Sequence, residues 1–300
     1  MINFIGKRKI SYIVSGLLFI TAVAGLIVYG LKPGMDFTGG SILEVSFTGQ
    51  RPEVSAVRMS VEGLFGNAVV QTSGDAGMIV KTRFLSEEEH QTLLGNLRTN
   101  YEKEDQKVLE QRFETIGPAV SAQLKERSAK AIVTVCIAII LFIAYSFRKV
   151  SKLVASWKYG VVAVVALVHD VVVTAGIFAF LGKYMNIEVD VPFVVALLTI
   201  LGYSVNDTIV VFDRVRENLI RRGSEHFDET VNYAVNETMA RSVNTTLTTL
   251  FPLATLFFFG GETIKYFSLA LFIGIFLGAY SSIFVASPLL VSWHKFSSRR

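Results

Sequence analysis

Three ionisable residues stand in or beside stretches that are apolar enough to lie in a membrane. Asp170 is about 12 residues into the apolar run 158–181, which at about 1.5 Å per helical residue places it near mid-membrane. Asp207 lies roughly 8 Å, by the same rise, from the end of the run 191–212. Arg241 follows later in the chain, at the start of another apolar run. Ionisable side chains in membrane helices are costly and typically functional. We therefore expect Asp207, Arg241 and Asp170 to take part in proton coupling, with Asp207 gaining and losing a proton and Arg241 as its counter-charge.

Polar residues accompany Asp207 on its own helix. Tyr203 and Ser204 precede it by four and three residues, so they share its helical face, and Asn206 is its immediate neighbour. This company favours a hydrated carboxylate that can exchange a proton. A purely structural ion pair between Asp207 and an arginine remains the alternative.

The next apolar run carries a second polar stripe. Thr245 and Thr248 follow Arg241 at helical spacing, so two antiparallel helices could form a polar lane that holds water. Hydroxyl side chains in membrane helices also serve only to pack helices closely. A structural role therefore stays open for the threonines, and for Asp170 with His169 as its local hydrogen-bond partner.

Other kinds of chemistry find little support. The glycines nowhere follow a phosphate-binding spacing with its lysine. The four histidines are scattered, and the single cysteine, Cys136, lies inside an apolar run. We expect no metal site, no cofactor, no catalytic residues and no enzymatic activity.

The elements that must position these residues are membrane helices. The chain has 300 residues, of which 51% are hydrophobic and 18% charged, whereas soluble domains are about a quarter charged. Six apolar runs approach or exceed the roughly 20 residues that a spanning helix needs. They cover residues 10–31, 129–147, 158–181, 191–212, 243–260 and 266–291.

The positive charges of the short connections predict the orientation. One side carries Lys7, Arg8, Lys9, Arg148, Lys149, Lys152, Lys158, Arg214, Arg216, Arg221, Arg222, Lys295, Arg299 and Arg300. The short loops of the other side carry only Lys183 and Lys265. Both termini are therefore expected in the cytoplasm, with residues 1–31 as the N-terminus and first helix. Residues 129–300 would hold the other five helices and a cytoplasmic loop, 213–242.

The long segment 32–128 is then extracytoplasmic, and its pattern predicts a small α+β domain. Strands are expected at 41–47, 68–72, 78–84 and 107–115, and helices at 53–66 and 87–103. The order strand-helix-strand-strand-helix-strand is that of a ferredoxin-like unit. The predicted fold is thus a polytopic α-helical membrane protein with one ferredoxin-like domain between its first two helices.

Several motifs closely resemble the SecD/SecF family of protein-export membrane subunits, which belongs to the RND superfamily. They are Asp36-Phe37-Thr38-Gly39-Gly40, Glu114-Thr115-Ile116-Gly117-Pro118, His169-Asp170, the block 202–218 around Asp207, Arg241 with the following Ser/Thr run, and Gly260-Gly261. The resemblance covers essentially the whole chain. One departure is Ser242, where the family pattern has threonine.

The resemblance implies an RND-type half with six helices, equivalent to SecF and not to a fused SecD–SecF chain. It implies a multi-pass protein of the inner membrane that pairs with SecD and uses the proton-motive force to assist export through SecYEG. Further partners would be the translocating polypeptide, membrane lipid and, as a candidate, YajC; no nucleic-acid partner is expected. Asp207 and Arg241 match positions that the family uses for proton coupling.

Two other classes of function compete with this one. A small-molecule exporter of the RND type would have about twice as many membrane helices and two large outer domains. An intramembrane enzyme could use Asp170 and Asp207 as a pair of carboxylates. It would need a motif such as Gly-x-Gly-Asp at the second aspartate, which Val205-Asn206-Asp207 does not match.

Overall fold

The computed structural model describes residues 1–103, 105–146, 156–222 and 226–297. Backbone contacts divide the chain into two compact units. Met1–Lys32 and Ala129–Arg300 form one, here called the helical unit, and Pro33–Ser128 form the other, here called the α+β domain.

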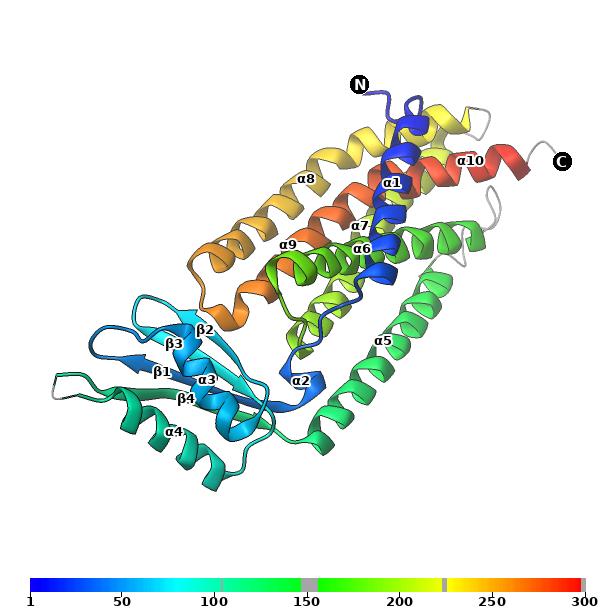
Figure 1. The fold of residues 1–300 in the computed structure, drawn as a ribbon. Helices are drawn as coiled ribbons and strands as arrows, with labels where there is room; N and C mark the ends of the chain where they lie inside the picture. The colour runs from blue at the N-terminus through cyan, green and yellow to red at the C-terminus, as the bar shows by residue number, and fades with distance from the viewer. Residues whose placement is uncertain (104, 147–155, 223–225, 298–300) are drawn as a thin grey trace. The chain divides into compact units, whose positions relative to one another are not determined.

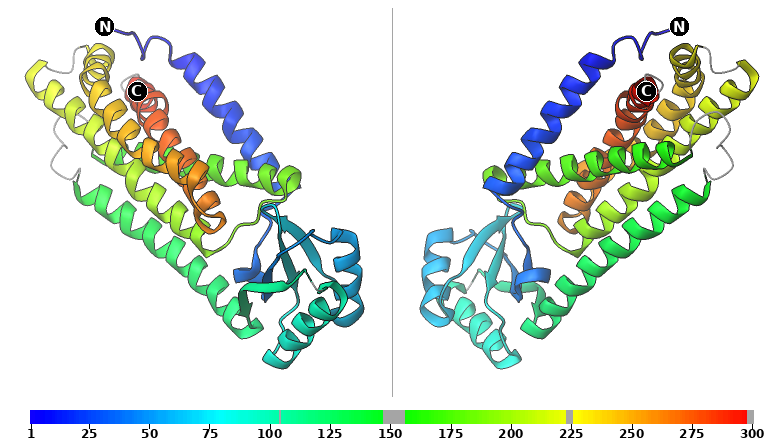
Figure 2. Two further views of the ribbon diagram at one scale, coloured as in Figure 1. Left: turned by 90° about the vertical axis from the view of Figure 1, so that its left-hand side faces the viewer. Right: turned by 90° about the vertical axis from the view of Figure 1, so that its right-hand side faces the viewer.

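Long helices build the helical unit, and the last of them contains a π-helical turn, η2 (Figure 1). They are α1 (Arg8–Val28), α5 (Pro118–Ser146, which begins in the α+β domain), α6 (Ser156–Met185), α7 (Val191–Arg222), α8 (Phe227–Phe259), α9 (Glu262–Ser281), η2 (Ser282–Ala286) and α10 (Ser287–Ser297). The helices α7, α8 and α9 run beside one another (Figures 1 and 2). The start of α1 and the end of α10 lie at the same end of the unit (Figure 1).

The chain is a multi-pass membrane protein. Within the described residues, five helical segments are long and apolar enough to cross a membrane. They are Arg8–Val28, Trp157–Met185, Val191–Arg221, Phe227–Phe259 and Ile264–Ser297. These correspond to five of the six predicted runs. The remaining run, 129–147, falls in the second half of α5 and just past its end, and is not among the five, so the count of six stays a prediction.

The predicted polar loop 213–242 is largely helical. Helix α7 continues to Arg222 and α8 begins at Phe227, while residues 223–225 lie outside the described chain. The two helices are joined there by a bidentate ion pair, in which Arg214 Nε and Nη2 donate to Glu237 at 2.8 and 2.7 Å. Asn218 donates to the same carboxylate at 2.7 Å. Such planar, forked pairing fixes geometry, so these polar residues hold two helices together.

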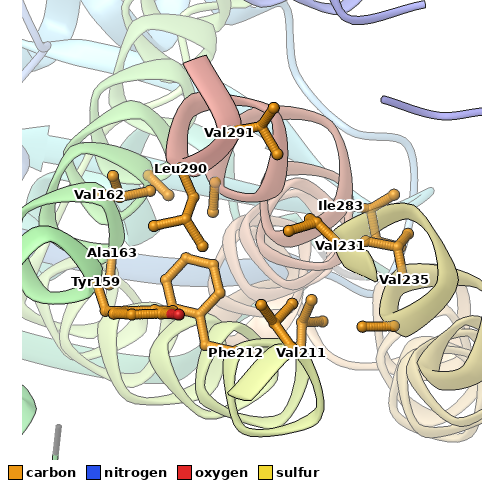
Figure 3. Close-up of a cluster of buried hydrophobic side chains, with 14 of the residues drawn as sticks. Tyr159, Val162, Ala163, Val211, Phe212, Val231, Val235, Ile283, Leu290 and Val291 are labelled. Carbon is orange, nitrogen blue, oxygen red and sulfur yellow. The ribbon is translucent and has the colours of Figure 1, made fainter. Parts of the chain in front are cut away.

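One hydrophobic cluster packs α6, α7, α8 and the last helix together (Figure 3). At its centre the rings of Tyr159 and Phe212 meet edge to face, with centroids 5.3 Å apart, an arrangement that aromatic pairs prefer. Leu290 and Val291 of α10 are fully buried in the same cluster. This packing fixes α6, α7 and α8, the helices that carry Asp170, Asp207 and Ser242.

Helix α9 approaches α7 closely through two glycines. A Cβ atom at Gly274 would lie 2.1 Å from Ile200 Cδ1, and one at Gly278 would lie 2.9 Å from Ser204 Cβ. Small residues at spacing four let helix backbones come together in membrane proteins. The close approach places the backbone of α9 beside Ser204.

The α+β domain has the predicted ferredoxin-like topology. Its strands are β1 (Gly40–Phe47), β2 (Val69–Ser73), β3 (Gly77–Thr82) and β4 (Val108–Ile116), and its helices are the short α2 (Met35–Thr38), α3 (Val54–Phe65) and α4 (Glu87–Tyr101). The sheet order is β2-β3-β1-β4, with all neighbours antiparallel. Alternate strand residues such as Leu43 and Val80 pack with Val57 and Leu93 from α3 and α4, which cover one face.

Helix α4 begins with a capping box. Ser86 Oγ accepts from the Glu89 amide, and the Glu89 side chain accepts from the Ser86 amide. Arg83 Nη2 also donates to Glu89 Oε1 at 2.6 Å. The Arg83 guanidinium and then the Ser86 amide lower the pKa of Glu89 to about 2. The ionised carboxylate therefore stabilises the start of this helix.

Candidate functional site

Asp170 of α6 is fully buried and accepts three hydrogen bonds. Ser204 Oγ of α7 and Ser281 Oγ of α9 both donate to its Oδ2, each at 2.6 Å. His169 Nδ1 lies 3.0 Å from its Oδ1, as predicted for a local partner. Buried carboxylates need such partners because an unpaired buried charge is costly. Asp170 thus joins three helices at one point.

Asp207 of α7 lies in a different environment. It is 8% exposed, and Ser242 Oγ of α8 donates to its Oδ1 at 2.6 Å. Its Oδ2 is buried and accepts no hydrogen bond from the residues that the structure describes. The Ser282 hydroxyl is near enough to interact with this carboxylate as a hydrogen-bonding group, and the Arg241 guanidinium acts on it as a nearby charge. Ser242 therefore fixes one oxygen of Asp207, and the Ser282 hydroxyl and the Arg241 guanidinium are other polar groups near this carboxylate.

Arg241 is not ion-paired with Asp207 in this structure, although both residues are described. Arg241 lies on the exposed side of α8, together with Thr245 and Thr248. The side of α8 that faces its neighbours carries Ser242 and Thr246 at this level instead. Arg241, Thr245 and Thr248 thus lie on one side of α8, as the sequence predicts. The contact with the Asp207 carboxylate is made by Ser242, the residue that follows Arg241.

The polar neighbours predicted for Asp207 divide between different contacts. Ser204 serves Asp170, as described, and Asn206 is exposed. Tyr203 reaches across to α8, where its hydroxyl donates to the Thr245 carbonyl at 3.0 Å and lies 3.2 Å from Thr249 Oγ1. Tyr203 therefore links the two helices that carry Asp207 and Ser242.

Sequence reasoning missed the hydroxyls of the last helix. Ser281 donates a hydrogen bond to Asp170, and Ser282 Oγ lies 2.9 Å from Thr208 Oγ1 of α7. Ser287 donates to the Ser282 carbonyl across the π-helical turn at 2.9 Å. The pair Ser281-Ser282 inside a long apolar run was the available signal, because buried hydroxyls need partners.

The motifs Asp36–Gly40 and Glu114–Pro118 meet inside the α+β domain. Gly39 and Gly40 have φ values of 72° and 138°, which favour glycine, and a Cβ at Gly40 would lie 2.7 Å from the Thr82 carbonyl. Gly40 pairs with Ile116 in the sheet, so the first motif lies against the second.

The flanking residues of these motifs have structural positions. Asp36 and Phe37 lie in α2, and Thr38 Oγ1 donates to the Gly34 carbonyl at 3.0 Å. Gly117 lies against Phe84, and Pro118 opens α5, where a helix tolerates proline best. The motifs thus shape the entry to and exit from the domain.

No group of three or more possible metal ligands occurs among the described residues. The polar centre therefore consists of two carboxylates, their hydroxyl donors, one imidazole and a nearby guanidinium. Such a set can bind, hold and release protons.

Comparison with known protein families gives two matches. The model for the SecD/SecF protein export membrane protein, C-terminal part, matches residues 96–296. The SecD/SecF GG motif model matches residues 24–50, which include Gly39 and Gly40.

Individual relatives agree with the family models. A protein translocase subunit SecF from Thermobaculum terrenum is 42% identical over 98% of this chain and 94% of its own length. One from Synechocystis is 36% identical over 97% of this chain and 94% of its own.

A solved structure has the same fold. The crystal structure of SecDF, a translocon-associated membrane protein from Thermus thermophilus, superposes with a TM-score of 0.82 at 35% identity. The match covers 98% of this chain but 39% of the SecDF chain, so this chain is equivalent to one part of that protein. The agreement of motifs, sequence and fold shows that the chain belongs to the SecD/SecF family of protein-export membrane proteins.

Proposed function

We propose that this chain is an accessory subunit of the Sec protein translocase that works with SecD and uses the proton-motive force to drive or complete export of polypeptides through SecYEG. The relatives named SecF support the translocase role. The fused SecDF of Thermus thermophilus supports SecD as the partner. YajC is a further candidate partner.

The proposed location is the inner membrane, with both termini in the cytoplasm. Arg8 at the start of α1 and Lys295 near the end of α10 both pair with Asp228 at the start of α8, so this end of the helical unit concentrates positive charge. Short positively charged segments stay on the cytoplasmic side. The α+β domain would then lie outside.

The observation that carries the proposal is the asymmetry of Asp207. Ser242 fixes one of its oxygens, and the other is buried without a hydrogen bond from the described residues. Protonation would give Oδ2 a hydrogen to donate, and deprotonation would leave a charge within reach of Arg241. The two states demand different arrangements of α7 and α8, so proton transfer can be coupled to helix movement.

The two aspartates take their hydrogen bonds from different hydroxyl groups. Asp170 takes its donors from Ser204 and Ser281, and Asp207 takes its donor from Ser242; no hydrogen bond between the two carboxylates is recorded within the described chain. A dyad that shares a proton needs the carboxylates in contact. We therefore favour a transport subunit over an enzyme.

The test is the change Asp207→Asn in the complex with SecD. This change keeps the side-chain shape but removes the titrating group. We expect normal abundance and partner binding, with the proton-gradient-dependent part of export into inverted vesicles abolished. The matched control is Asp213→Asn, six residues along the same helix, where the side chain is 72% exposed.

Two outcomes would contradict the proposal. Export by Asp207→Asn that still responds to the proton gradient would exclude coupling at this residue. Loss of protein that is restored by adding Arg241→Gln would indicate a structural ion pair, because an unpaired buried charge destabilises a protein.

A further inference from the structure

The first residues of the chain are held against α8 by two asparagines. The Asn236 side chain accepts from the Ile2 amide and donates to the Ile2 carbonyl, both at 2.9 Å. One helical turn earlier, Asn232 Oδ1 accepts from the amides of Phe4 and Ile5 at 2.8 and 3.2 Å. Residues 2–5 are here called the strap. Their backbone groups form hydrogen bonds with the side-chain amides of Asn232 and Asn236 on α8.

These contacts are specific to asparagine at this place. A carboxamide both donates and accepts, so each side chain can satisfy an amide and a carbonyl of a non-helical segment. Asn232 Nδ2 also donates to the Ile2 carbonyl, at 3.1 Å. A backbone segment without secondary structure needs such partners wherever it is buried.

Apolar and charged contacts fix the strap further. Ile5 is 2% exposed and belongs to the hydrophobic cluster of Figure 3, and the Phe4 ring packs edge to face on Phe284. Directly after the strap, Arg8 pairs with Asp228 of α8 at 3.3 Å. The strap is thus a docked element with polar, apolar and ionic contacts.

Helix α8 connects the strap to Asp207. Ser242, the donor to Asp207, follows Asn236 by six residues on the same helix, or about 9 Å. A helix of this kind moves largely as a rigid body over such a distance. Any displacement of α8 at Ser242 therefore reaches the strap.

The strap continues into α1, whose far end leads to the α+β domain. There the Lys32 carbonyl accepts from the Val189 amide at 2.8 Å, and Lys32 Nζ donates to Asn186 Oδ1 at 2.5 Å. Between its ends α1 packs closely on α6, since a Cβ at Gly176 would lie 2.4 Å from Ala22 Cβ. Helix α1 therefore connects the strap directly to Lys32, and it packs on α6 between these two ends.

We propose that Asn232 and Asn236 are positioning residues that keep the strap fixed on α8, so that movement of α8 at the Asp207–Ser242 contact is transmitted through α1 to the chain entering the α+β domain. This inference rests on the proposed proton-coupled function. It assigns to residues 2–5 a role as a permanent mechanical link.

The test replaces both asparagines by leucine, of similar size but without hydrogen bonds, in the full chain with SecD. We expect normal abundance and SecD binding, but a loss of proton-gradient stimulation of export by about fivefold or more, the lower range of coupling between sites. The matched control is Glu229→Gln, an exposed residue at the same end of α8, which should export normally.

A cross-link separates a mechanical role from a merely stabilising one. Cysteines at Ile2 and Asn236, in a chain that also carries Asn232→Leu and Cys136→Ala, can be joined by a short thiol cross-linker. Joining them should restore the stimulation of export by the proton gradient. If the linker is reducible, its reduction should abolish this stimulation again.

Each other outcome overturns the inference. Undiminished stimulation in the double leucine variant would show that the strap transmits nothing. Loss of abundance, or failure of the cross-link to restore stimulation, would show that the asparagines serve stability alone. Either result leaves the proposed function intact, because that depends on Asp207→Asn.

Discussion

The close contact between α9 and α7 at Gly278 makes Asp170 sensitive to one added methyl group. In Gly278→Ala the new Cβ would lie 2.9 Å from Ser204 Cβ and 3.2 Å from Ser204 Cα. Carbon atoms in contact prefer about 3.5–4.0 Å. Because Ser204 is fully buried and its Cα is backbone, the helices must separate by at least about 0.6 Å to reach that spacing.

The separation acts on the hydrogen bonds of Asp170. Ser204 Oγ lies 2.6 Å from Asp170 Oδ2, and Ser281 of α9 donates to the same oxygen. Moving one donor by about 0.6 Å takes it beyond the usual upper limit of about 3.0 Å for such bonds. Overpacking costs about 1–3 kcal/mol, and a weakened hydrogen bond to a charged group costs about 1.5–3 kcal/mol.

Thermal unfolding of the purified protein in detergent measures this effect. We expect the Tm of Gly278→Ala to fall by at least about 4 °C, since 1 kcal/mol corresponds to about 2–4 °C in a chain of this size. The control is Gly202→Ala on α7, where an added Cβ meets nothing within 4 Å. Replacing a helical glycine by alanine there should raise stability by up to about 1 kcal/mol.

An equal Tm for the two alanine variants would refute this reasoning. It would mean that the α7–α9 contact relaxes without cost and that the Ser204 hydrogen bond does not depend on it.

Two further predictions concern charge and topology. Because the pKa of Glu89 is lowered to about 2, its charge stabilises the start of α4 fully above the ordinary value of 4.5, and this stabilisation is lost as the pH falls towards 2. Hydrogen-exchange protection at the start of α4 should therefore fall in this pH window. In Glu89→Gln the protection should be low already at neutral pH, whereas in Glu88→Gln it should not. Equal protection in both variants would contradict the prediction. In a Cys136→Ala chain, a cysteine at Asp75 should be labelled from outside in intact spheroplasts and one at His226 only after the membrane is opened, so outside labelling at His226 would reverse the proposed orientation.

The sequence predicts the elements of this fold well because each has a distinct periodicity. A short run after a turn-rich connection, 78–84, and helical spacing in 53–66 predicted a strand and a helix that the structure contains within two residues at each end. The apolar runs predicted five observed membrane-length helices. The sixth, 129–147, is not among the described segments that are long and apolar enough to cross a membrane, so it stays a prediction.

The contacts of the polar centre were harder to predict. Arg241 and Ser242 differ by about 100° around α8, and helical spacing alone does not say which of them faces Asp207. That rotation is set by packing, since the buried residues Leu250 and Leu253 continue the face of Ser242. The hydroxyl partners of Asp170 come from residues 34 and 111 positions away, beyond any local pattern.

The π-helical turn at Ser282–Ala286 determines how the second half of the last membrane helix is rotated relative to the first half. Such a turn amounts to one extra residue in an α-helix. Where it begins, Ser281 and Ser282 face Asp170 and Thr208. After it, Leu290 and Val291 face the hydrophobic cluster. Deleting one residue of the turn would make the helix regular but would rotate its end by about 100° relative to its beginning. One half would then lose its partners, so the helix can serve both the polar centre and the hydrophobic cluster only at this length.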